Sequence, residues 1–185
     1  YNSPAPLISR LYPDRLIINV TNMCAMFCRH CLRRKDIGDK DLIYSRSMLR
    51  EALKYISQNE EIRDVLLTGG DALSLSDDQL DWILTELDKI PHVEIKRLGS
   101  RMPCVLPQRI TPQLCRMLEK HDPVYLNTQY NHPKEITSDT KKAVDMLTKA
   151  GVIVRDQTVL LKGIHNDPHV MKIVMPEMLR IKVAP

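Results

Sequence analysis

Short apolar segments alternate with longer amphipathic ones along almost the whole chain, and this alternation most constrains the fold. The apolar segments suit strands that are buried on both faces. They predict strands at residues 15–20, 64–67, 93–98, 124–128, 152–160 and 181–184. The segments between them predict helices at residues 47–57, 76–89, 111–121, 137–150 and 169–179. Strand–helix alternation of this kind favours right-handed crossovers and a parallel sheet in an α/β fold.

Start and stop signals agree with these helices. Ser76, Thr137 and the pair Thr111-Pro112 are residues that favour the first positions of a helix. Gly151 follows the helix expected to end at Ala150, where a left-handed residue commonly closes a helix. The sequence therefore predicts the boundaries of several helices as well as their number.

The length of 185 residues fits one domain with a sizeable core, residues 1–185, with residues 1–14 as a lead-in. No apolar run approaches the length of a membrane span. The last expected strand, residues 181–184, has no helix after it to cover it, and an uncovered apolar edge strand is a liability. We therefore expect this domain to be part of a longer protein.

Polar and glycine-rich segments follow the expected strands. In parallel α/β folds, the carboxyl ends of the strands carry the chemistry. The segments at these ends are the cysteine loop that begins at Cys24, Thr68-Gly69-Gly70-Asp71, Gly99-Ser100-Arg101 and residues 127–132, with Gln157 inside the fifth expected strand. Each segment alone is also explained by turn chemistry, but five together predict a site.

Three cysteines lie close together as Cys24-x3-Cys28-x2-Cys31. Three thiolates can hold three irons of a four-iron cluster, whereas an ordinary electron-transfer cluster takes four cysteines. The fourth iron is then left open to bind a substrate or cofactor. The spacing therefore favours an iron–sulfur cluster with one open corner.

Two other interpretations of the cysteines stay open. A structural zinc site needs four ligands, and His30 inside the loop could be the fourth. The cysteines could also be reduced structural thiols, because their number is odd and no secretory signal is present. Cys104 and Cys115 are isolated in the sequence, and we interpret them as small apolar residues.

The formal charge of +4 is mild and does not by itself require a nucleic-acid partner. A basic cluster surrounds the last cysteine of the motif, made of Arg29, His30, Arg33, Arg34 and Lys35. It is either a solvated loop or a pocket for carboxylates or phosphates. Thiolates without an export signal indicate a reducing, cytoplasmic location.

The motif Cys24-Ala-Met-Phe-Cys28-Arg-His-Cys31 resembles the cluster motif of radical S-adenosylmethionine (SAM) enzymes. Further segments resemble the lysine 2,3-aminomutase family in particular: residues 12–15 (YPDR), 19–24 (NVTNMC), 65–73 (VLLTGGDAL), 91–95 (PHVEI), 106–111 (LPQRIT), 126–133 (LNTQYNHP) and 157–161 (QTVLL). The resemblance covers nearly the whole chain.

The resemblance implies a partial (βα)6 TIM-like barrel of the radical SAM type. It also implies an isomerase that moves an amino group from C2 to C3 of L-glutamate or L-lysine. A [4Fe–4S] cluster held by Cys24, Cys28 and Cys31 would cleave SAM to a 5′-deoxyadenosyl radical, while pyridoxal 5′-phosphate (PLP) carries the substrate. A small amino-acid substrate and a one-electron donor protein are thus the expected partners, and neither nucleic acid nor membrane is expected.

Roles for single residues follow from the same resemblance. The expected SAM-binding residues are His30, Gly69, Gly70, Asp71, Ser100, Gln129 and Gln157. Tyr12 and Arg15 match the positions that hold the PLP phosphate, and Arg33 matches the residue that grips the substrate carboxylate. Arginine suits both tasks because it is permanently charged and forked.

The chain also departs from the family pattern. The lysine that forms the Schiff base with PLP lies in a glycine-rich segment, and Lys162-Gly163 does not match that segment. We therefore expect no Schiff-base lysine in these residues. Lysine-specific members usually have arginine where Leu11 stands and histidine where Gln129 stands, so this chain looks closer to the glutamate 2,3-aminomutase branch.

Two other functions stay in view. A radical SAM enzyme that modifies RNA would use the basic loop as a phosphate track, but it would need stacking aromatics, and the chain has one Phe and one Trp. A non-catalytic iron–sulfur or metal module is the third hypothesis, and zinc in anaerobically purified protein would favour it. The family tends to associate, so a homo-oligomer also stays open.

Overall fold

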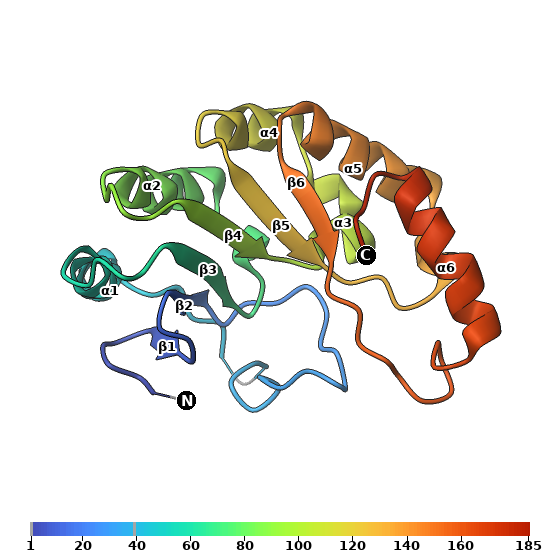
Figure 1. The fold of residues 1–185 in the computed structure, drawn as a ribbon, viewed down its shortest axis with the longest axis horizontal. Coiled ribbons are helices and arrows are strands. Elements are labelled where there is room, and N and C mark those ends of the chain that lie inside the picture. The colour runs from blue at the N-terminus through green and yellow to red at the C-terminus, as the bar shows by residue number, and fades with distance from the viewer. Residues whose placement is uncertain (1, 39) are drawn as a thin grey trace. The chain divides into compact units, whose positions relative to one another are not determined.

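The computed structural model describes residues 2–38 and 40–185. The chain divides into two compact units, Tyr1–Gly99 and Ser100–Pro185. Each unit contains parallel strands and helices (Figure 1). The helices bury their apolar sides.

The first unit contains four strands: β1 (Ile8–Arg10), β2 (Arg15–Thr21), β3 (Asp64–Gly69) and β4 (Ile95–Gly99). Strand β1 runs antiparallel to β2, while β2, β3 and β4 pair in parallel in sequence order. The register places Arg15 opposite Asp64, and it shifts between Asn19 and Thr21 at the carboxyl end of β2.

The two faces of this sheet differ in character. Leu16, Ile18 and Val20 are buried, as are the alternate residues Val65 and Leu67 of β3. The helices α1 (Arg46–Ser57) and α2 (Asp77–Asp88) add their apolar sides to this core. Because successive strand residues point to opposite faces, the other face of β2 carries Arg15, Ile17 and Asn19. Arg15 and Asn19 therefore lie on the same face of β2.

The second unit contains β5 (Val124–Thr128) and β6 (Ile153–Asp156), which pair in parallel. Its helices are α3 (Met102–Val105), α4 (Pro112–Glu119), α5 (Ser138–Lys149) and α6 (Pro168–Arg180). Short 3₁₀ helices occur in both units, at η1 (Ala72–Ser74), η2 (Pro107–Arg109) and η3 (Pro133–Glu135). Buried residues such as Leu114, Leu126 and Leu147 form the core.

The predicted helices are confirmed, each within two residues of the expected ends. Ser76, Thr111 and Thr137 are the N-caps of α2, α4 and α5, and their side chains accept hydrogen bonds from backbone N–H groups of the first turn. Gly151 has a φ of 82° after α5, a conformation that glycine adopts without strain. Local start and stop signals therefore act as expected.

Three strand predictions were wrong in extent. The strand expected at residues 93–98 begins at Ile95, and the strand expected at 152–160 ends at Asp156. Gln157 consequently lies just after β6 rather than inside it. The strand expected at 181–184 is reduced to one bridge between Arg155 and Ala184, because α6 continues to Arg180 and Lys182 has a φ of 65°. A left-handed residue interrupts an extended strand.

None of the helices in the described part of the chain is long and apolar enough to cross a membrane.

Candidate functional site

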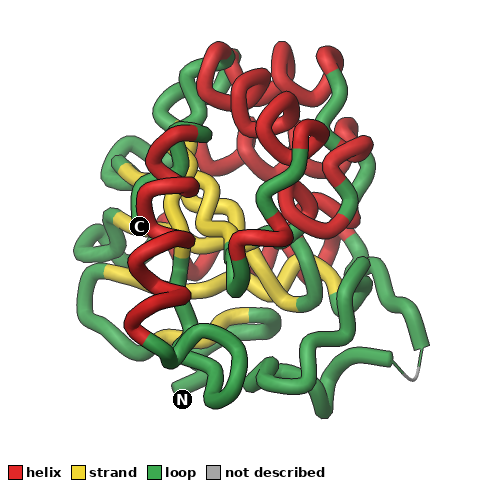
Figure 2. Tube along the Cα trace, turned by 90° about the vertical axis from the view of Figure 1, so that its right-hand side faces the viewer, coloured by secondary structure: helices red, strands yellow, loops and turns green. Residues whose placement is uncertain are grey.

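The cysteine motif lies in a long loop after β2, and residues 22–38 form neither helix nor strand (Figure 2). Cys24, Cys28 and Cys31 form no disulfide and are half-buried. The thiols of Cys24 and Cys28 both donate to the carbonyl of Met26, at 3.1 and 3.6 Å. The sulfur of Cys31 accepts from the N–H of Arg33 at 3.3 Å. Short turns thus keep all three sulfurs within one loop.

This donor set fits an iron–sulfur cluster. Among the described residues, no three His, Cys, Asp or Glu side chains converge as the ligands of one metal ion. A four-iron cluster does not require such convergence, because each thiolate binds a different iron. Burial raises the pKa of the Cys24 thiol, and the Asp71 carboxylate raises it further. Iron binding would have to overcome this preference for the protonated form.

The segment after β3 is hydrogen-bonded to the start of the cysteine loop. Gly70 N–H donates to Thr21 O at 2.7 Å, and Asp71 N–H donates to Met23 O at 2.8 Å. A Cβ on Gly69 or Gly70 would lie 2.1 Å from a carbonyl oxygen of Thr21 or Met23. The two glycines are therefore required by this close approach of two backbones, whatever they contact in a cofactor.

Asp71 has a structural task of its own. The residue is 3% exposed, and its carboxylate accepts from Leu73 N–H at 2.9 Å as the N-cap of η1. This bond orients the turn that follows Gly70. His30 is half-buried between the second and third cysteines of the loop.

Arg33 lies in the cysteine loop and contacts the face of β2 that carries Arg15 and Asn19. Its guanidinium donates to the Asn19 side chain, which the sequence analysis did not single out. Both residues line a small cavity of about 80 Å³ together with Thr21, Tyr44 and Gly69. A polar residue at a strand position that shares a face with Arg15 is the signal that could have identified Asn19.

Tyr12 and Arg15 lie together at the opposite end of β2 from the cysteine loop. The guanidinium carbon of Arg15 is 5.5 Å from the centre of the Tyr12 ring, a cation–π distance. Arg15 also donates through Nε to Asp64 at 2.8 Å. Because Arg15 and Asn19 are four residues apart on one face, about 13 Å separates the two arginine sites along the strand.

In the second unit, Ser100, Gln129 and Gln157 gather at the carboxyl ends of β5 and β6. Ser100 N–H donates to Asn127 O at 3.0 Å, and Gln157 N–H donates to Thr128 O at 2.8 Å. The backbone carbonyl of Gln129 accepts a hydrogen bond from Arg101 Nε at 3.3 Å. Backbone bonds thus place these three predicted residues next to one another.

Asp156, which the sequence analysis missed, and Cys104 lie near the residue that follows Gln129. Asp156 accepts from Tyr130 N–H at 2.7 Å, and burial raises the pKa of this carboxyl group. Burial also raises the pKa of the Cys104 thiol to about 12, with the Glu135 carboxylate adding to the effect. Cys104 is therefore a protonated, unreactive thiol at neutral pH, as the sequence suggested.

Buried polar atoms without a hydrogen-bond partner also occur in this unit. They are Thr128 Oγ1, Tyr130 OH, Asn131 Oδ1 and both ring nitrogens of His165. Such atoms usually mark a place that binds water or a ligand. Three of these residues, Thr128, Tyr130 and Asn131, flank Gln129 in the chain, which fits the expected role of this strand end in holding a cofactor.

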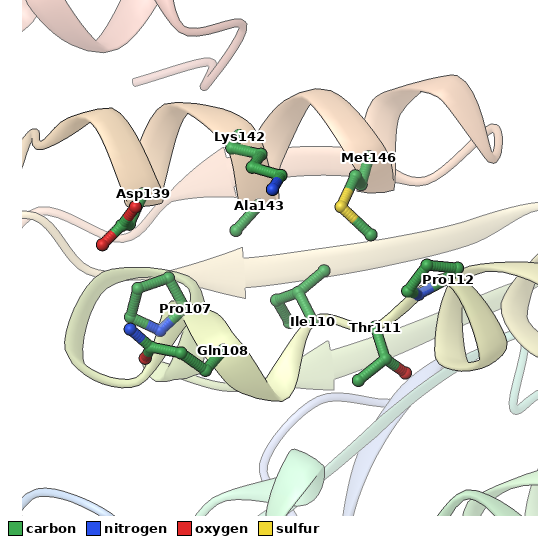
Figure 3. Close-up of a pocket in the computed structure, with 9 residues that line it drawn as sticks. All are labelled: Pro107, Gln108, Ile110, Thr111, Pro112, Asp139, Lys142, Ala143 and Met146. Carbon is green, nitrogen blue, oxygen red and sulfur yellow. The ribbon is translucent and has the colours of Figure 1, made fainter.

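A larger pocket of about 390 Å³ lies elsewhere in the second unit (Figure 3). Asp139, Lys142 and Met146 of α5 line it opposite Ile110 and Pro112. No predicted site residue lines it. The sequence-derived site and this pocket are therefore separate features.

Comparison with known proteins decides the family. Residues 18–173 match the model of the radical SAM superfamily. The chain belongs to the radical SAM superfamily. Its cofactors are a [4Fe–4S] cluster and SAM, which agrees with the three thiols of the cysteine loop. The predicted α/β fold class, a partial (βα)6 TIM-like barrel, is confirmed with it.

Similar proteins within the radical SAM superfamily are amino-acid 2,3-aminomutases. The chain is 56% identical to glutamate 2,3-aminomutase of Clostridioides difficile, over all of the chain and 44% of that protein. It is 49% and 48% identical to the L-lysine 2,3-aminomutases of Fusobacterium nucleatum and Clostridium subterminale, again over all of the chain and over 43% and 44% of those proteins. The predicted resemblance to the lysine 2,3-aminomutase family, nearer its glutamate branch, is confirmed. The chain spans less than half the length of these relatives.

Proposed function

We propose that the protein containing this domain is a PLP- and SAM-dependent amino-acid 2,3-aminomutase, an isomerase that moves an amino group from C2 to C3. The observation that carries the proposal is the pair of arginine sites on one face of β2. Arg33 donates a hydrogen bond to Asn19, and Arg15 lies against the Tyr12 ring. Strand positions 15 and 19 are about 13 Å apart. That separation suits an amino acid joined to PLP, with its carboxylate at one end and the phosphate at the other.

Each predicted residue has a defined task in this proposal. Cys24, Cys28 and Cys31 hold the cluster, and Gly69, Gly70 and Asp71 shape the loop beside it and contact SAM. His30, Ser100, Gln129 and Gln157 bind SAM. When bound, the cluster with SAM supplies a 5′-deoxyadenosyl radical, and PLP supplies a π-system for the migrating amino group.

Arg33 holds the substrate carboxylate, and Tyr12 with Arg15 holds the PLP phosphate. A forked guanidinium can donate two parallel hydrogen bonds to either anion. Holding the carboxylate and the phosphate at these two positions would restrict rotation of the bound substrate and orient its β-carbon.

We propose L-glutamate as the preferred substrate and L-lysine as the alternative. The higher identity to a glutamate 2,3-aminomutase supports this order, as do Leu11 and Gln129. Discrimination between the two amino acids requires opposite charges at the distal end of the pocket.

The remaining partners are proposals of the same kind. A one-electron donor protein supplies the reducing equivalent for SAM cleavage, and assembly into a homo-oligomer is part of the proposal. All five cysteines lie in the described part of the chain and none forms a disulfide, which supports a reducing, cytoplasmic location.

The deciding experiment is an anaerobic assay of the full-length protein with a reconstituted cluster, SAM, PLP and a reductant. Glutamate and lysine are offered together, and the accumulating β-amino acid is identified. We expect β-glutamate. Accumulation of β-lysine would show that lysine is the preferred substrate. SAM cleavage without either product would contradict both proposed substrates.

The cluster assignment has its own control. Changing Cys24, Cys28 or Cys31 to Ala should abolish both the cluster and SAM cleavage, whereas Cys115→Ala should leave the cluster spectrum unchanged. A full four-iron cluster in any of the three variants would contradict the assignment. Modification of RNA by the protein would instead favour the RNA-modifying enzyme. Zinc in the anaerobically purified protein would favour the non-catalytic metal module.

A further inference from the structure

Asp64 is a buried acid at the first position of β3, and no sequence motif singled it out. It lies opposite Arg15 in the register of β2 and β3, and it is 2% exposed. A buried carboxylate is costly unless cations and hydrogen bonds compensate it. Two arginines do so here, one from each neighbouring strand.

The two arginines contact Asp64 differently. Arg97 of β4 donates from Nε to Oδ1 at 2.8 Å and from Nη2 to Oδ2 at 2.7 Å. This two-pronged contact fixes the plane of the carboxylate. Arg15 donates through Nε alone, to Oδ2 at 2.8 Å. Asp64 therefore holds Arg15 by one edge while Arg97 holds Asp64.

The outer edge of Arg15 is left available. In the residues that the structure describes, no hydrogen bond is made by its two terminal nitrogens, and its side chain is 46% exposed. The Tyr12 ring lies 5.5 Å from the guanidinium carbon and restricts its remaining motion. A guanidinium held on one edge and flanked by a ring presents its free fork in a fixed direction.

The charge balance of the cluster favours an anion. Two guanidiniums and one carboxylate leave one positive charge on this face of the sheet. The nearby acids Asp14 and Glu94 pair with Arg63, at 3.3 and 3.5 Å, rather than with Arg15. The excess charge of Arg15 is therefore not cancelled by these neighbours.

We propose that Asp64 and Arg97 are positioning residues for a phosphate site formed by Tyr12 and Arg15. The inference rests on the proposed role of Tyr12 and Arg15 with PLP and extends that site to two residues on β3 and β4. Arg97 orients Asp64, and Asp64 orients Arg15 so that its terminal nitrogens meet the phosphate oxygens.

The variant Asp64→Asn separates positioning from simple electrostatics. It removes a negative charge from the cluster, so charge alone would tighten the binding of phosphate. If Asp64 positions Arg15, the same variant should instead weaken PLP binding by about tenfold, because a charge-assisted bond is lost. The dissociation constants of PLP, pyridoxal and inorganic phosphate are measured on the full-length protein by calorimetry.

We expect weaker binding of PLP and phosphate and unchanged binding of pyridoxal, which lacks the phosphate. Equal weakening of PLP and pyridoxal would overturn the inference, because the effect would then be a general disturbance. Unchanged or tighter PLP binding would overturn it as well. Circular dichroism verifies that the variant is folded.

Arg97→Lys is the second variant, and it carries the test if Asp64→Asn does not fold. Lysine keeps the charge but cannot make the two-pronged contact, so PLP binding should weaken although the net charge is the same. Unchanged PLP binding in Arg97→Lys would contradict the inference. Arg63→Gln is the matched control, because it removes an exposed charge next to Asp64 and should leave PLP binding unchanged.

Arg15→Ala distinguishes this inference from the proposed function. If Arg15→Ala does not weaken PLP binding, the phosphate site itself is wrong. If Arg15→Ala weakens it while Asp64→Asn and Arg97→Lys do not, the phosphate site stands and the positioning role of Asp64 and Arg97 falls.

Discussion

Single residues carry more than one task in this molecule, and the paired glycines are the clearest case. Gly69 and Gly70 were expected to let a backbone approach SAM, yet the structure shows them in contact with Thr21 and Met23. Sequence alone could not separate the two tasks, because both require the absence of a Cβ. The contact depends on how two distant segments meet.

Gly70→Ala should therefore disturb the cysteine loop. The added Cβ would lie 2.1 Å from Met23 O, next to Cys24, and relief of this overlap should cost roughly 1–3 kcal/mol of stability. We expect reduced iron content after reconstitution together with a lower denaturation midpoint. Gly163→Ala is the control, since its Cβ would meet nothing within 4 Å and its positive φ adds only backbone strain. Equal iron content in the two variants would contradict this expectation.

Arg33 is the residue whose predicted role has the most direct kinetic test. Arg33→Ala in the full-length protein should raise the KM for the amino acid about tenfold or more, because a charge-assisted bond to the carboxylate is lost. Arg34→Ala is the matched control: Arg34 is exposed and donates to Arg29 O within the loop. An Arg33→Ala enzyme with an unchanged KM would assign the carboxylate to another residue.

At the scale of elements, the helix ends were predicted correctly from local signals, whereas the extents of strands that depend on pairing were not. The caps Ser76, Thr111 and Thr137 are encoded within one turn of sequence, so the helices could be predicted from sequence. Strand β1 was missed because three residues carry no periodicity and depend on pairing with β2. The end of β6 was misplaced because side-chain bonds of Asp156 to Tyr130 N–H and Thr158 compete with strand continuation.

The α2 cap provides a test at this scale. Ser76 and Gln79 form a reciprocal capping box at the start of the helix. Ser76→Ala should lower the free energy of unfolding by about 1 kcal/mol. Ser57→Ala is a suitable control, because the Ser57 hydroxyl donates to Lys54 O at the end of α1 and caps no N-terminus. The free energy of unfolding of both variants is measured by urea denaturation. An equal decrease in the two variants would refute the capping role.

At the scale of the whole molecule, the predicted site residues fall into both compact units. The cysteine loop, Gly69 to Asp71 and the arginine sites belong to Tyr1–Gly99, and Ser100, Gln129 and Gln157 belong to Ser100–Pro185. The rule that the carboxyl ends of parallel strands carry the chemistry pointed to the cysteine loop, Gly69 to Asp71 and the polar residues of the second unit, whereas Tyr12, Arg15 and Arg33 were predicted from the family resemblance alone. The contacts that hold them, such as Arg33 with Asn19 and Asp64 with two arginines, have no local sequence signature.

The expected absence of a Schiff-base lysine also belongs to this scale. If the full-length protein is loaded with PLP and reduced with borohydride, peptide mapping should place the pyridoxyl-lysine outside residues 1–185. The reason is that Lys162-Gly163 lacks the glycine-rich surroundings expected of that lysine. A pyridoxyl group on Lys162 would overturn this prediction, and unreduced protein carried through the same digestion is the control.

The two backbone bonds between the glycine segment and the cysteine loop also offer a spectroscopic reporter. The amide protons of Gly70 and Asp71 exchange with solvent only when they separate from Thr21 O and Met23 O. Their exchange rates therefore measure how firmly the stem of the cysteine loop is held in solution. Comparison of these two protons before and after cluster loading would show whether iron tightens a loop that is already fixed or fixes one that was opening.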